Sequence, residues 1–389
     1  MRVLCLLYES MHCLVLKKVI TVIYDFLVIG GGIAGVSAAY ELAEHGTVLL
    51  LESEDILGYH ATGRSAALFT RNFGGATVRQ INAASTKFFL SPPTGFCETP
   101  LLTSRGCLTI APPGFEAELE TLLAMSEPGE EIVQIDRISA CEMVPFLRSD
   151  RIAHAVFEAN VTDIDVATLM QSYLKGAKAR GATIMPKQKV VGLSRCASVW
   201  NVQSANHSFS AKKVINAAGA WADQIAVLAG AAPICLVPKQ RTGIIINAPS
   251  DINCTAMPVV DFAGSDAYIK PDAGRLMASL GDATPTEPQD AWPDDIDIAI
   301  LADWIERETT ISVTKIEYSW AGLRSFVSDE APVVGFDPEI PDFFWLAGQG
   351  GFGIMMAPVL AMLTADLCMN TTSSRINLFA QSLSPHRLR

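Results

Sequence analysis

Apolar runs that end in glycine recur three times along the chain, and each predicts a buried strand, a tight turn and a following helix. The first run, residues 26–29, leads into Gly30-Gly-Gly-Ile-Ala-Gly35. The second lies in Lys213-Val-Ile-Asn-Ala-Ala-Gly-Ala-Trp221, and the third in Phe343-Phe-Trp-Leu-Ala-Gly-Gln-Gly-Gly-Phe-Gly353. Strands without polar alternation are typical of a parallel sheet that helices cover on both faces.

The remaining periodicity predicts further helices and strands. Helical spacing at 33–45 precedes an apolar strand at 47–51, which ends on Glu52. Asp163 and Asp165 precede a helix at 166–180, as N-capping residues do. Alternating segments predict strands at 190–193 and 199–202, and antiparallel strands at 242–246, 257–260, 267–270 and 275–280. Two more helices are predicted at 295–309 and 354–368.

The first glycine turn and Glu52 together carry the chemistry of dinucleotide binding. Gly30 permits a tight turn, Gly32 lets the backbone approach a pyrophosphate, and Gly35 allows close packing of helix on strand. The phosphates would then lie at a helix N-terminus. Glu52, at the end of the next strand, is placed to accept a hydrogen bond from a ribose hydroxyl, which favours FAD or NAD over NADP. The alternative is an ordinary turn of an α/β protein.

The order of the elements predicts an α/β chain in which two architectures alternate. A Rossmann-like dinucleotide domain is predicted from residues 24–75, 164–236 and 325–389. A second, α+β domain on a mixed, largely antiparallel sheet is predicted from residues 76–163 and 237–324. Residues 1–23 form an extension with no assigned role, because Lys17 and Lys18 interrupt the apolar run that a membrane span needs and no signal cleavage site follows.

Composition and charge narrow the function classes. The 389 residues are 50% apolar and 18% charged, which is typical of a globular enzyme of about two domains. The net charge of −12 argues against a nucleic-acid partner. Nine scattered cysteines, without a Cys-x-x-Cys pair, predict reduced thiols in a cytoplasmic protein, and we predict no metal site. Peripheral membrane contact stays open but has no positive signal.

Three glycine-rich strand ends are more than a nicotinamide-binding domain needs, and this favours a flavin. A helix that begins at Gly350 would direct its positive end toward a ring that becomes anionic on reduction. The flavin would perform the redox step, since the sequence contains no recognisable Ser-His-Asp or Cys-His arrangement for nucleophilic catalysis.

Several sequence blocks carry a resemblance to a known family. They are Gly58-Tyr-His-Ala-Thr-Gly-Arg-Ser-Ala-Ala67, Pro93-Thr-Gly-Phe-Cys-Glu98, Asn216-Ala-Ala-Gly-Ala-Trp221, Tyr268-Ile-Lys-Pro-Asp-Ala-Gly274, Trp320-Ala-Gly-Leu-Arg-Ser-Phe326 and Gly348-Gln-Gly-Gly-Phe-Gly353. With these blocks the chain, from residue 24 to its end, resembles the FAD-dependent oxidoreductases of the D-amino-acid oxidase family. Within that family it looks closest to the bacterial D-arginine and D-amino-acid dehydrogenases. The resemblance implies a glutathione-reductase-like FAD-binding domain.

The resemblance also implies a set of cofactor contacts, with FAD held non-covalently because no cysteine stands at a matching attachment position. Together with the glycine turn, the expected FAD-binding residues are Gly30, Gly32, Ala34, Gly35, Glu52, Ser53, Ala61, Thr62, Gly63, Arg64, Ser65, Ala66, Ala67, Leu68, Val190, Gly350, Gly351, Phe352, Gly353, Ile354 and Met355.

Substrate binding is expected at Arg241 and Arg324, whose guanidinium groups match a carboxylate in two-point contact. Tyr268 resembles the tyrosine that holds the same group, and the resemblance places Gly351 at a further pocket position.

The chain departs from the D-arginine dehydrogenases at three positions. Cys107, a pocket position by the resemblance, replaces a glutamate that reads the substrate guanidinium. Leu68 replaces a histidine of the flavin-side loop, and Phe73 replaces a pocket tyrosine. Asp261 could supply another carboxylate, or could simply lie at a turn.

These features predict an FAD-dependent enzyme that oxidises a small amino acid by hydride transfer to flavin N5. The imine would then hydrolyse to a 2-oxo acid and ammonia. The lost polar groups favour a D-amino acid with a neutral or apolar side chain. Two alternatives remain, a glycine or sarcosine oxidase-like enzyme that produces peroxide and a non-catalytic FAD-binding protein. The electron acceptor stays open among a quinone, an electron-transfer protein and oxygen.

Overall fold

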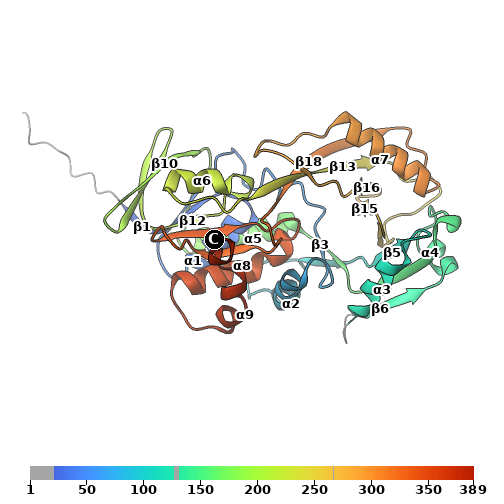
Figure 1. Ribbon diagram of the computed structural model, residues 1–389, viewed down its shortest axis with the longest axis horizontal. Helices are drawn as coiled ribbons and strands as arrows, with labels where there is room; N and C mark the ends of the chain where they lie inside the picture. The colour runs from blue at the N-terminus through green and yellow to red at the C-terminus, as the bar shows by residue number, and fades with distance from the viewer. Residues whose placement is uncertain (1–21, 127–130, 266) are drawn as a thin grey trace, which may run out of the picture.

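The computed structural model describes residues 22–126, 131–265 and 267–389 of the chain. Figure 1 shows its elements gathered around two β-sheets that lie side by side along the long axis of the molecule. Most of the predicted extension at residues 1–23 lies outside the described residues, and its last residue begins strand β1 (Ile23–Ile29). No helix of the described ranges is both long enough and apolar enough to cross a bilayer.

The first sheet has eight strands in the order β10-β11-β12-β1-β2-β9, with β20 beside β12 and β19 beside β20. Besides β1, its strands are β2 (Val48–Leu51), β9 (Thr183–Met185), β10 (Val190–Cys196), β11 (Val199–Ser204), β12 (Ser208–Asn216), β19 (Val333–Phe336) and β20 (Phe343–Ala347). Strand β1 is parallel to both of its neighbours, β12 and β2, and β12 is also parallel to β20. The three glycine turns predicted from the sequence therefore follow strands of one parallel region.

Helices cover both faces of the first sheet, which explains why β1 is apolar without alternation. Phe26 and Val28 lie in the core formed with α1 (Ile33–Leu42), α5 (Val166–Ala179) and α8 (Gly353–Cys368). Leu27 and Ile29 lie in the opposite core, with side chains of α6 (Ala222–Ala229). Burial on two faces removes the polar positions that a half-exposed strand would show. Helix α1 ends three residues before the predicted end of its periodic segment.

Helix α2 (Ala76–Leu90) packs on the first sheet although the sequence assigned it to the other domain. Val78, Ile81 and Phe89 are buried in the core that α1 and α8 share. The apolar face of α2 fits the helical layer of the first sheet, because that layer already contains α8 and the C-terminal α9 (Ser374–Leu383). From this packing, we propose that the domain boundary predicted after residue 75 lies after Leu90 instead.

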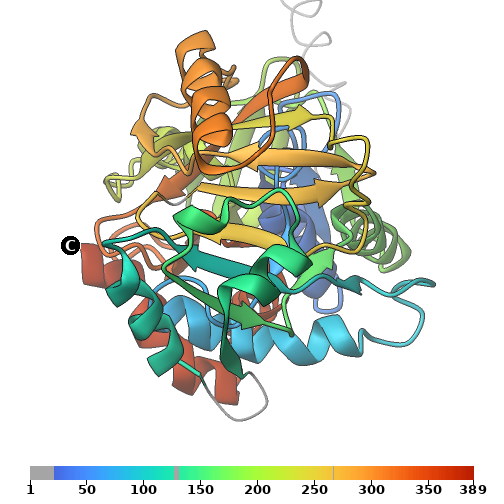
Figure 2. The same ribbon diagram turned by 90° about the vertical axis from the view of Figure 1, so that its right-hand side faces the viewer.

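The second sheet has nine strands in the order β17-β13-β16-β15-β14-β5-β7-β6, with β18 beside β13 (Figure 2). Its strands are β5 (Cys107–Ala111), β6 (Ile132–Ile135), β7 (His154–Glu158), β13 (Val237–Ile246), β14 (Val259–Phe262), β15 (Ala267–Asp272), β16 (Arg275–Ser279), β17 (Thr284–Pro285) and β18 (Ile316–Phe326). Only the pairing of β14 with β5 is parallel among the pairs of this sheet in the described ranges. The antiparallel prediction was right for one edge of β14 and wrong for the other, because a strand's own pattern does not reveal a distant partner.

Smaller elements complete the structure. Helix α7 (Asp295–Glu308) packs on one face of the second sheet, where Leu301, Trp304 and Ile305 join the strand side chains in one core. The others are α3 (Glu116–Ala124), α4 (Arg137–Met143), the short helices η1 (Ser149–Arg151), η2 (Gly219–Trp221) and η3 (Pro385–Leu388), and a third sheet of β3 (Leu68–Phe69), β8 (Thr162–Ile164) and β4 (Leu102–Ser104).

Glu41 on α1 should make the stability of the fold depend on pH. Burial raises the pKa of Glu41 from 4.5 to about 7, although the charge of Arg180 opposes this shift. The folded chain thus binds a proton that the unfolded chain has already released, so this contribution to the unfolding free energy is full below pH 4.5 and is lost as the pH rises through about 7. We expect Glu41→Gln to remove this fall in the unfolding free energy between pH 5 and pH 8. The measurement is the urea concentration at the unfolding midpoint, compared at the two pH values. A midpoint difference between variant and unmodified protein that is the same at both pH values would contradict the prediction.

Candidate functional site

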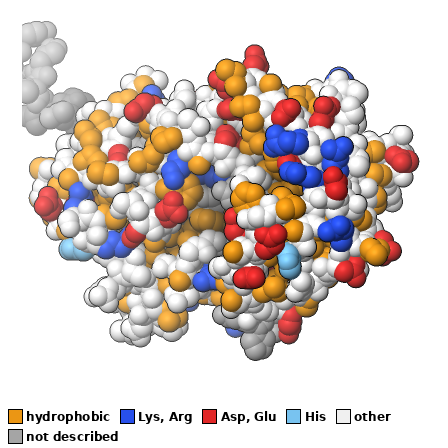
Figure 3. Space-filling model, turned by 45° about the vertical axis from the view of Figure 1, so that its right-hand side comes forward, with side chains coloured by type: hydrophobic (Ala, Val, Ile, Leu, Met, Phe, Trp, Pro, Cys, Tyr) orange, Lys and Arg blue, Asp and Glu red, His pale blue; other side chains and the backbone are white. Residues whose placement is uncertain are grey.

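A cavity of about 800 Å³ lies between the two sheets, and the surface is hollowed between the two halves of the molecule (Figure 3). This volume falls in the upper part of the range of about 300–1,000 Å³ that ligand pockets occupy. One wall comes from the strand ends of the first sheet and the other from one face of the second sheet. A single ligand could therefore contact both architectures that alternate along the chain.

The first glycine turn is shaped by close backbone contacts. Gly30 has φ of +110°, and a Cβ placed on it would lie 2.3 Å from the carbonyl oxygen of Ala217. A Cβ on Gly35 would lie 1.9 Å from the carbonyl oxygen of Gly30. Only glycine meets both demands, since other residues rarely adopt this φ and any side chain would push β1 away from β12 and α1. Gly32 and Ala34 line the cavity, whereas Gly35 lies behind its wall.

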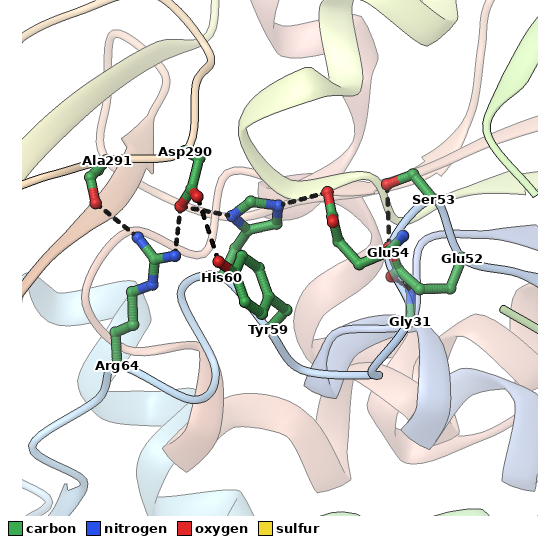
Figure 4. Close-up of polar contacts among 9 residues, drawn as sticks. All are labelled: Gly31, Glu52, Ser53, Glu54, Tyr59, His60, Arg64, Asp290 and Ala291. Atoms are coloured by element: carbon green, nitrogen blue, oxygen red, sulfur yellow. Dashed lines mark hydrogen bonds and ion pairs between the residues drawn. The ribbon is translucent and has the colours of Figure 1, made fainter. Parts of the chain in front are cut away.

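Glu52, at the end of β2, is 9% exposed and points back at the glycine turn (Figure 4). The backbone N–H of Gly31 donates to Oε2 of Glu52 at 2.6 Å. Oε1 accepts from the backbone N–H of Glu54 at 2.8 Å and from the Ser53 hydroxyl at 3.0 Å. A carboxylate oxygen accepts more than one hydrogen bond, and Glu52 and Ser53 both line the cavity. The carboxylate is thereby fixed where a ribose hydroxyl could donate to it.

The loop at 58–65 runs along the cavity and meets the start of α1. Helix α1 has no side-chain cap of its own, and the Thr62 hydroxyl accepts from the backbone N–H of Ile33 at 3.0 Å instead. The predicted loop residues that line the cavity are Ala61, Thr62, Arg64, Ser65 and Ala66, joined by Val190 from β10. Gly63, Ala67 and Leu68, also predicted to contact FAD, are outside the lining.

The third glycine turn differs from its prediction. Helix α8 begins at Gly353 rather than Gly350, because Gly350 has φ of +53° and pairs with Ser325 of β18 in an isolated bridge. The backbone N–H of Gly350 donates to the Ser325 carbonyl at 2.9 Å. Of the residues predicted here, Gly350, Gly351, Gly353 and Ile354 line the cavity, whereas Phe352 and Met355 turn into the core.

Next to this turn, Nε2 of Gln349 is buried without a hydrogen-bond partner among the described residues, and Gln349 lines the cavity. A buried donor without a partner costs free energy. A ligand that brings an acceptor to this position would remove that cost. The site therefore fits a polar ring or a carboxylate held beside the turn.

Arg241 and Arg324 lie on the same face of the second sheet. Arg241 on β13 is paired with Gly322 on β18, and Arg324 follows two residues later on that strand. Residues in this diagonal relation project from one face and come within about 7–8 Å of each other. The opposite face is apolar and packs on α7, so the two cations lie together at the cavity wall.

Arg324 is the second cation at the cavity wall, and its guanidinium group is available to a ligand. Among the described residues its guanidinium makes no hydrogen bond and no ion pair, and it lies over Gly351, where a Cβ would come within 3.0 Å of a guanidinium nitrogen. The Nε of Arg241 donates to the Asp282 carbonyl at 2.9 Å, which fixes the direction of that side chain. Gly351 thus leaves the space in which the guanidinium of Arg324 can face the cavity.

Tyr268 on β15 completes this end of the cavity. Burial raises the pKa of Tyr268, although Arg324 and Arg241 oppose the shift by their charges. The hydroxyl thus stays protonated at neutral pH and can donate to an anionic ligand. Two cations and one neutral donor around the same space match the charge and the hydrogen-bonding capacity of a carboxylate.

Phe73 and Cys107, predicted as pocket residues, lie outside the cavity lining. Phe73 is exposed and its ring contacts that of Phe352 at 5.3 Å between centroids. Cys107 is buried, and its thiol donates to Asp261 at 3.4 Å within a small cluster behind Tyr268 that Leu68 also contacts. Burial raises the pKa of Cys107 well above its ordinary value, so the thiol stays neutral. Asp261 lies within β14 rather than at a turn.

Sequence reasoning missed residues that the two sheets bring to the cavity. Those with polar or aromatic side chains are Glu54, Tyr59, His60, Gln188, Lys189, Trp221, Gln224, Thr242, Ser279, Gln289, Asp290, Trp320, Ser325 and Gln349. Tyr59 and His60 belong to a block already quoted for the resemblance, so the loop itself was a usable signal. Nothing near Asp290 in the sequence indicates the cavity, because only the fold brings it to loop 58–65.

Comparisons with known proteins agree with this geometry. A family model described as FAD dependent oxidoreductase matches residues 25–367. A glycine oxidase of Geobacillus kaustophilus (strain HTA426) is 22% identical over 378 residues, which cover 93% of this chain and 97% of that protein. The mitochondrial dimethylglycine dehydrogenase of Homo sapiens is 26% identical over 281 residues, which cover 69% of this chain but 32% of that larger protein.

Among solved structures, L-proline dehydrogenase from P. horikoshii superposes with a TM-score of 0.80 at 22% identity, over 94% of this chain and 97% of that one. The fold class predicted from the sequence is confirmed. The relatives reported are a glycine oxidase and a dimethylglycine dehydrogenase rather than a D-arginine dehydrogenase. They support the broad resemblance and not the narrower one.

Proposed function

The chain belongs to the family of FAD-dependent oxidoreductases with FAD as its cofactor, and from this premise we propose that it oxidises the Cα–N bond of a small amino acid. One observation carries the proposal. The cavity that begins at the Gly30 turn and Glu52 ends between Arg324, Arg241 and Tyr268. A dinucleotide at one end and a carboxylate at the other would share a single space.

The residues present fit FAD. The close backbone of the first glycine turn and the fixed carboxylate of Glu52 suit a dinucleotide. At the third turn, Nε2 of Gln349, which has no partner among the described residues, suits a polar ring. These groups are spread along one cavity, as an extended polar ligand requires.

When bound, FAD supplies the acceptor for a hydride from the substrate carbon. Arg324 and Arg241 bind and orient the substrate carboxylate, and Tyr268 donates to the same group. No side chain of the cavity is needed as a nucleophile.

We propose glycine or an N-alkylated glycine as the substrate class. Two relatives, at 22% and 26% identity, are named glycine oxidase and dimethylglycine dehydrogenase, and both names refer to amines that carry one carboxylate and no side chain at Cα. This is the alternative that the sequence left open, and these relatives favour it over a D-amino acid. The carboxylate site formed by Arg324 and Tyr268 serves such a substrate without further contacts.

A neutral D-amino acid is a second candidate, favoured by the apolar part of the cavity wall. Met277 on β16 is a buried side chain of the lining and projects from the same face of its strand as Ser279, the partner of Tyr268. It could hold an apolar group at Cα. D-Arginine should be a poor substrate, because Cys107 and Asp261 lie outside the lining and an unpaired cation would be costly to bury there.

Anaerobic titration of the holoenzyme tests the proposal. We expect glycine, sarcosine or dimethylglycine to bleach the flavin absorbance fastest, with neutral D-amino acids slower and D-arginine slowest. A peroxide assay on the same substrates assigns the acceptor, since an oxidase produces peroxide and a dehydrogenase needs a dye or a protein. If no amino acid or N-alkylated amino acid bleaches the flavin, the proposed function is wrong and the alternative of a non-catalytic FAD-binding protein gains.

A further inference from the structure

A short segment of the second sheet reaches across the cavity to the dinucleotide-binding loop. We call it the strap, residues 286–294, between β17 and α7. Gln289, Asp290 and Ala291 of the strap line the cavity, as do Tyr59, His60 and Arg64 of loop 58–65. Tyr59 and Asp290 are 231 positions apart in the sequence. The contact between strap and loop therefore depends on how the two sheets are placed.

Asp290 is the hub of that contact (Figure 4). Its carboxylate forms an ion pair with the Arg64 guanidinium and accepts from the Tyr59 hydroxyl at 3.2 Å. Nδ1 of His60 lies 3.9 Å from the same carboxylate. Burial opposes ionisation of Asp290, but the hydrogen bond and charge of Arg64 outweigh it and lower the pKa of Asp290. Asp290 is therefore a charged group at neutral pH that joins three side chains of the loop.

Arg64 holds the second sheet at two further points. It donates to the carbonyl oxygens of Ala291 at 2.8 Å and Ala321 at 2.9 Å. Its own carbonyl accepts from the indole N–H of Trp320 at 3.1 Å. Arg64 thus contacts both the strap and β18, the strand that carries Arg324.

Apolar burial contributes little to holding the strap. Ala291 is buried in a small cluster with Ala220, Ala321 and Leu323. The adjacent Trp292 is 75% exposed, so the largest apolar side chain of the strap makes no core. The polar contacts of Asp290 and Arg64 are then the main attachment of the strap to the loop.

A chain of polar contacts links this attachment to the residue placed to bind ribose. Nε2 of His60 lies 3.2 Å from Oε1 of Glu54, and the backbone N–H of Glu54 donates to Glu52. Figure 4 shows these groups following one another from Asp290 through His60 and Glu54 to Glu52. The strap and the ribose end of the cavity are therefore parts of one connected polar arrangement.

We propose that Asp290 is a cofactor-retaining residue, which fastens the strap to loop 58–65 and so closes the cavity over bound FAD. FAD can leave only when the contacts of Asp290 to Arg64 and Tyr59 are broken. Exposed ion pairs contribute little on their own, but here one carboxylate joins several groups whose loss would act together at the cavity wall. The proposal depends on the cofactor and not on the identity of the substrate.

The test is the rate of FAD release from the holoenzyme, measured as flavin absorbance in the filtrate after timed ultrafiltration. Asp290→Ala should release FAD about tenfold to a hundredfold faster, since hydrogen bonds to a charged group are among the stronger ones. Asp290→Glu, which keeps the carboxylate, should release FAD at a rate closer to that of the unmodified protein. Asp303→Ala is the matched control, because it removes the ion pair of 3.2 Å with Arg307 outside the cavity lining and should leave the release rate unchanged.

A purely structural role is separated by thermal unfolding at increasing FAD concentration. If Asp290 retains FAD, added FAD should raise the unfolding midpoint of Asp290→Ala less than that of the unmodified protein, because stabilisation by a ligand grows with its affinity. A rise in midpoint from the FAD-free to the FAD-saturated state that is equal in the two proteins, or a release rate equal to that of the unmodified protein, would overturn the proposal. Both readouts work without substrate, so an absence of flavin bleaching would count against the proposed function only.

Discussion

Replacing Arg324 by methionine should lower kcat/KM for the amino-acid substrate about a thousandfold, because truncating one partner of a buried charge pair costs about 2–5 kcal/mol and about 1.36 kcal/mol corresponds to tenfold. Its guanidinium lies free of protein partners in the described structure and faces the cavity over Gly351. The bound carboxylate would lose both its counter-charge and its two-point contact. Most of the loss should appear in KM if the carboxylate is bound equally in the ground state and transition state, and in kcat if orientation is lost.

Two measurements and one control variant define this result. Steady-state kinetics gives kcat and KM, flavin absorbance gives the FAD content, and Arg275→Met on the exposed end of β16 serves as control. Arg324→Lys should fall between Arg324→Met and the unmodified protein, since it keeps the charge without the planar fork. Full activity of Arg324→Met would show that the carboxylate binds elsewhere.

Replacing Gly30 by alanine should abolish FAD binding and lower the free energy of unfolding by about 3 kcal/mol or more. A positive φ costs about 1–3 kcal/mol in other residues, and overpacking adds about 1–3 kcal/mol. The added Cβ would lie 2.3 Å from the Ala217 carbonyl, which belongs to a backbone that cannot move without disturbing β12. The purified variant is expected to be colourless and to unfold at lower urea concentration.

Gly75→Ala is the matched control for that variant. Gly75 is the N-cap of α2 with φ of −66°, and a Cβ there would meet no atom within 4 Å. The same chemical change is therefore expected to leave flavin content unchanged and to lower the unfolding midpoint only slightly, by the weaker N-capping of alanine. Retention of FAD by Gly30→Ala would show that the turn tolerates a side chain and that the dinucleotide chemistry assigned to it is wrong.

The parallel region of the first sheet could be predicted from the sequence because strands such as β2 and β20 are buried on two faces. A continuous apolar run such as the one in β1, followed by glycine, has few alternatives. The extent and pairing of the strands in the second sheet were harder to predict. Strands β13 and β18 extend beyond the short alternating segments of this region, and the parallel partner of β14 lies far earlier in the chain. Pairing between distant strands leaves no trace in the local pattern.

The candidate site, like the fold, could be predicted from the sequence only in part. Residues defined by backbone chemistry, such as Gly30 and Glu52, stand where the sequence placed them, and Arg324 lies at the cavity as expected. Phe73 and Cys107 were placed by correspondence with a relative, and local packing turns both away from the cavity. Asp290 could not be predicted, since its partners Tyr59 and Arg64 lie in loop 58–65, far away in the sequence.

The bridge between Ser325 and Gly350 has a consequence for how such an enzyme can change. It ties the strand that carries Arg324 to the glycine turn through main-chain atoms alone. If Arg324 binds the substrate and the redox ring lies beside Gly350, as we propose, the spacing between the two would be independent of nearly every side chain in the wall. New specificities can arise by substitution around the pocket while the reaction distance is inherited unchanged.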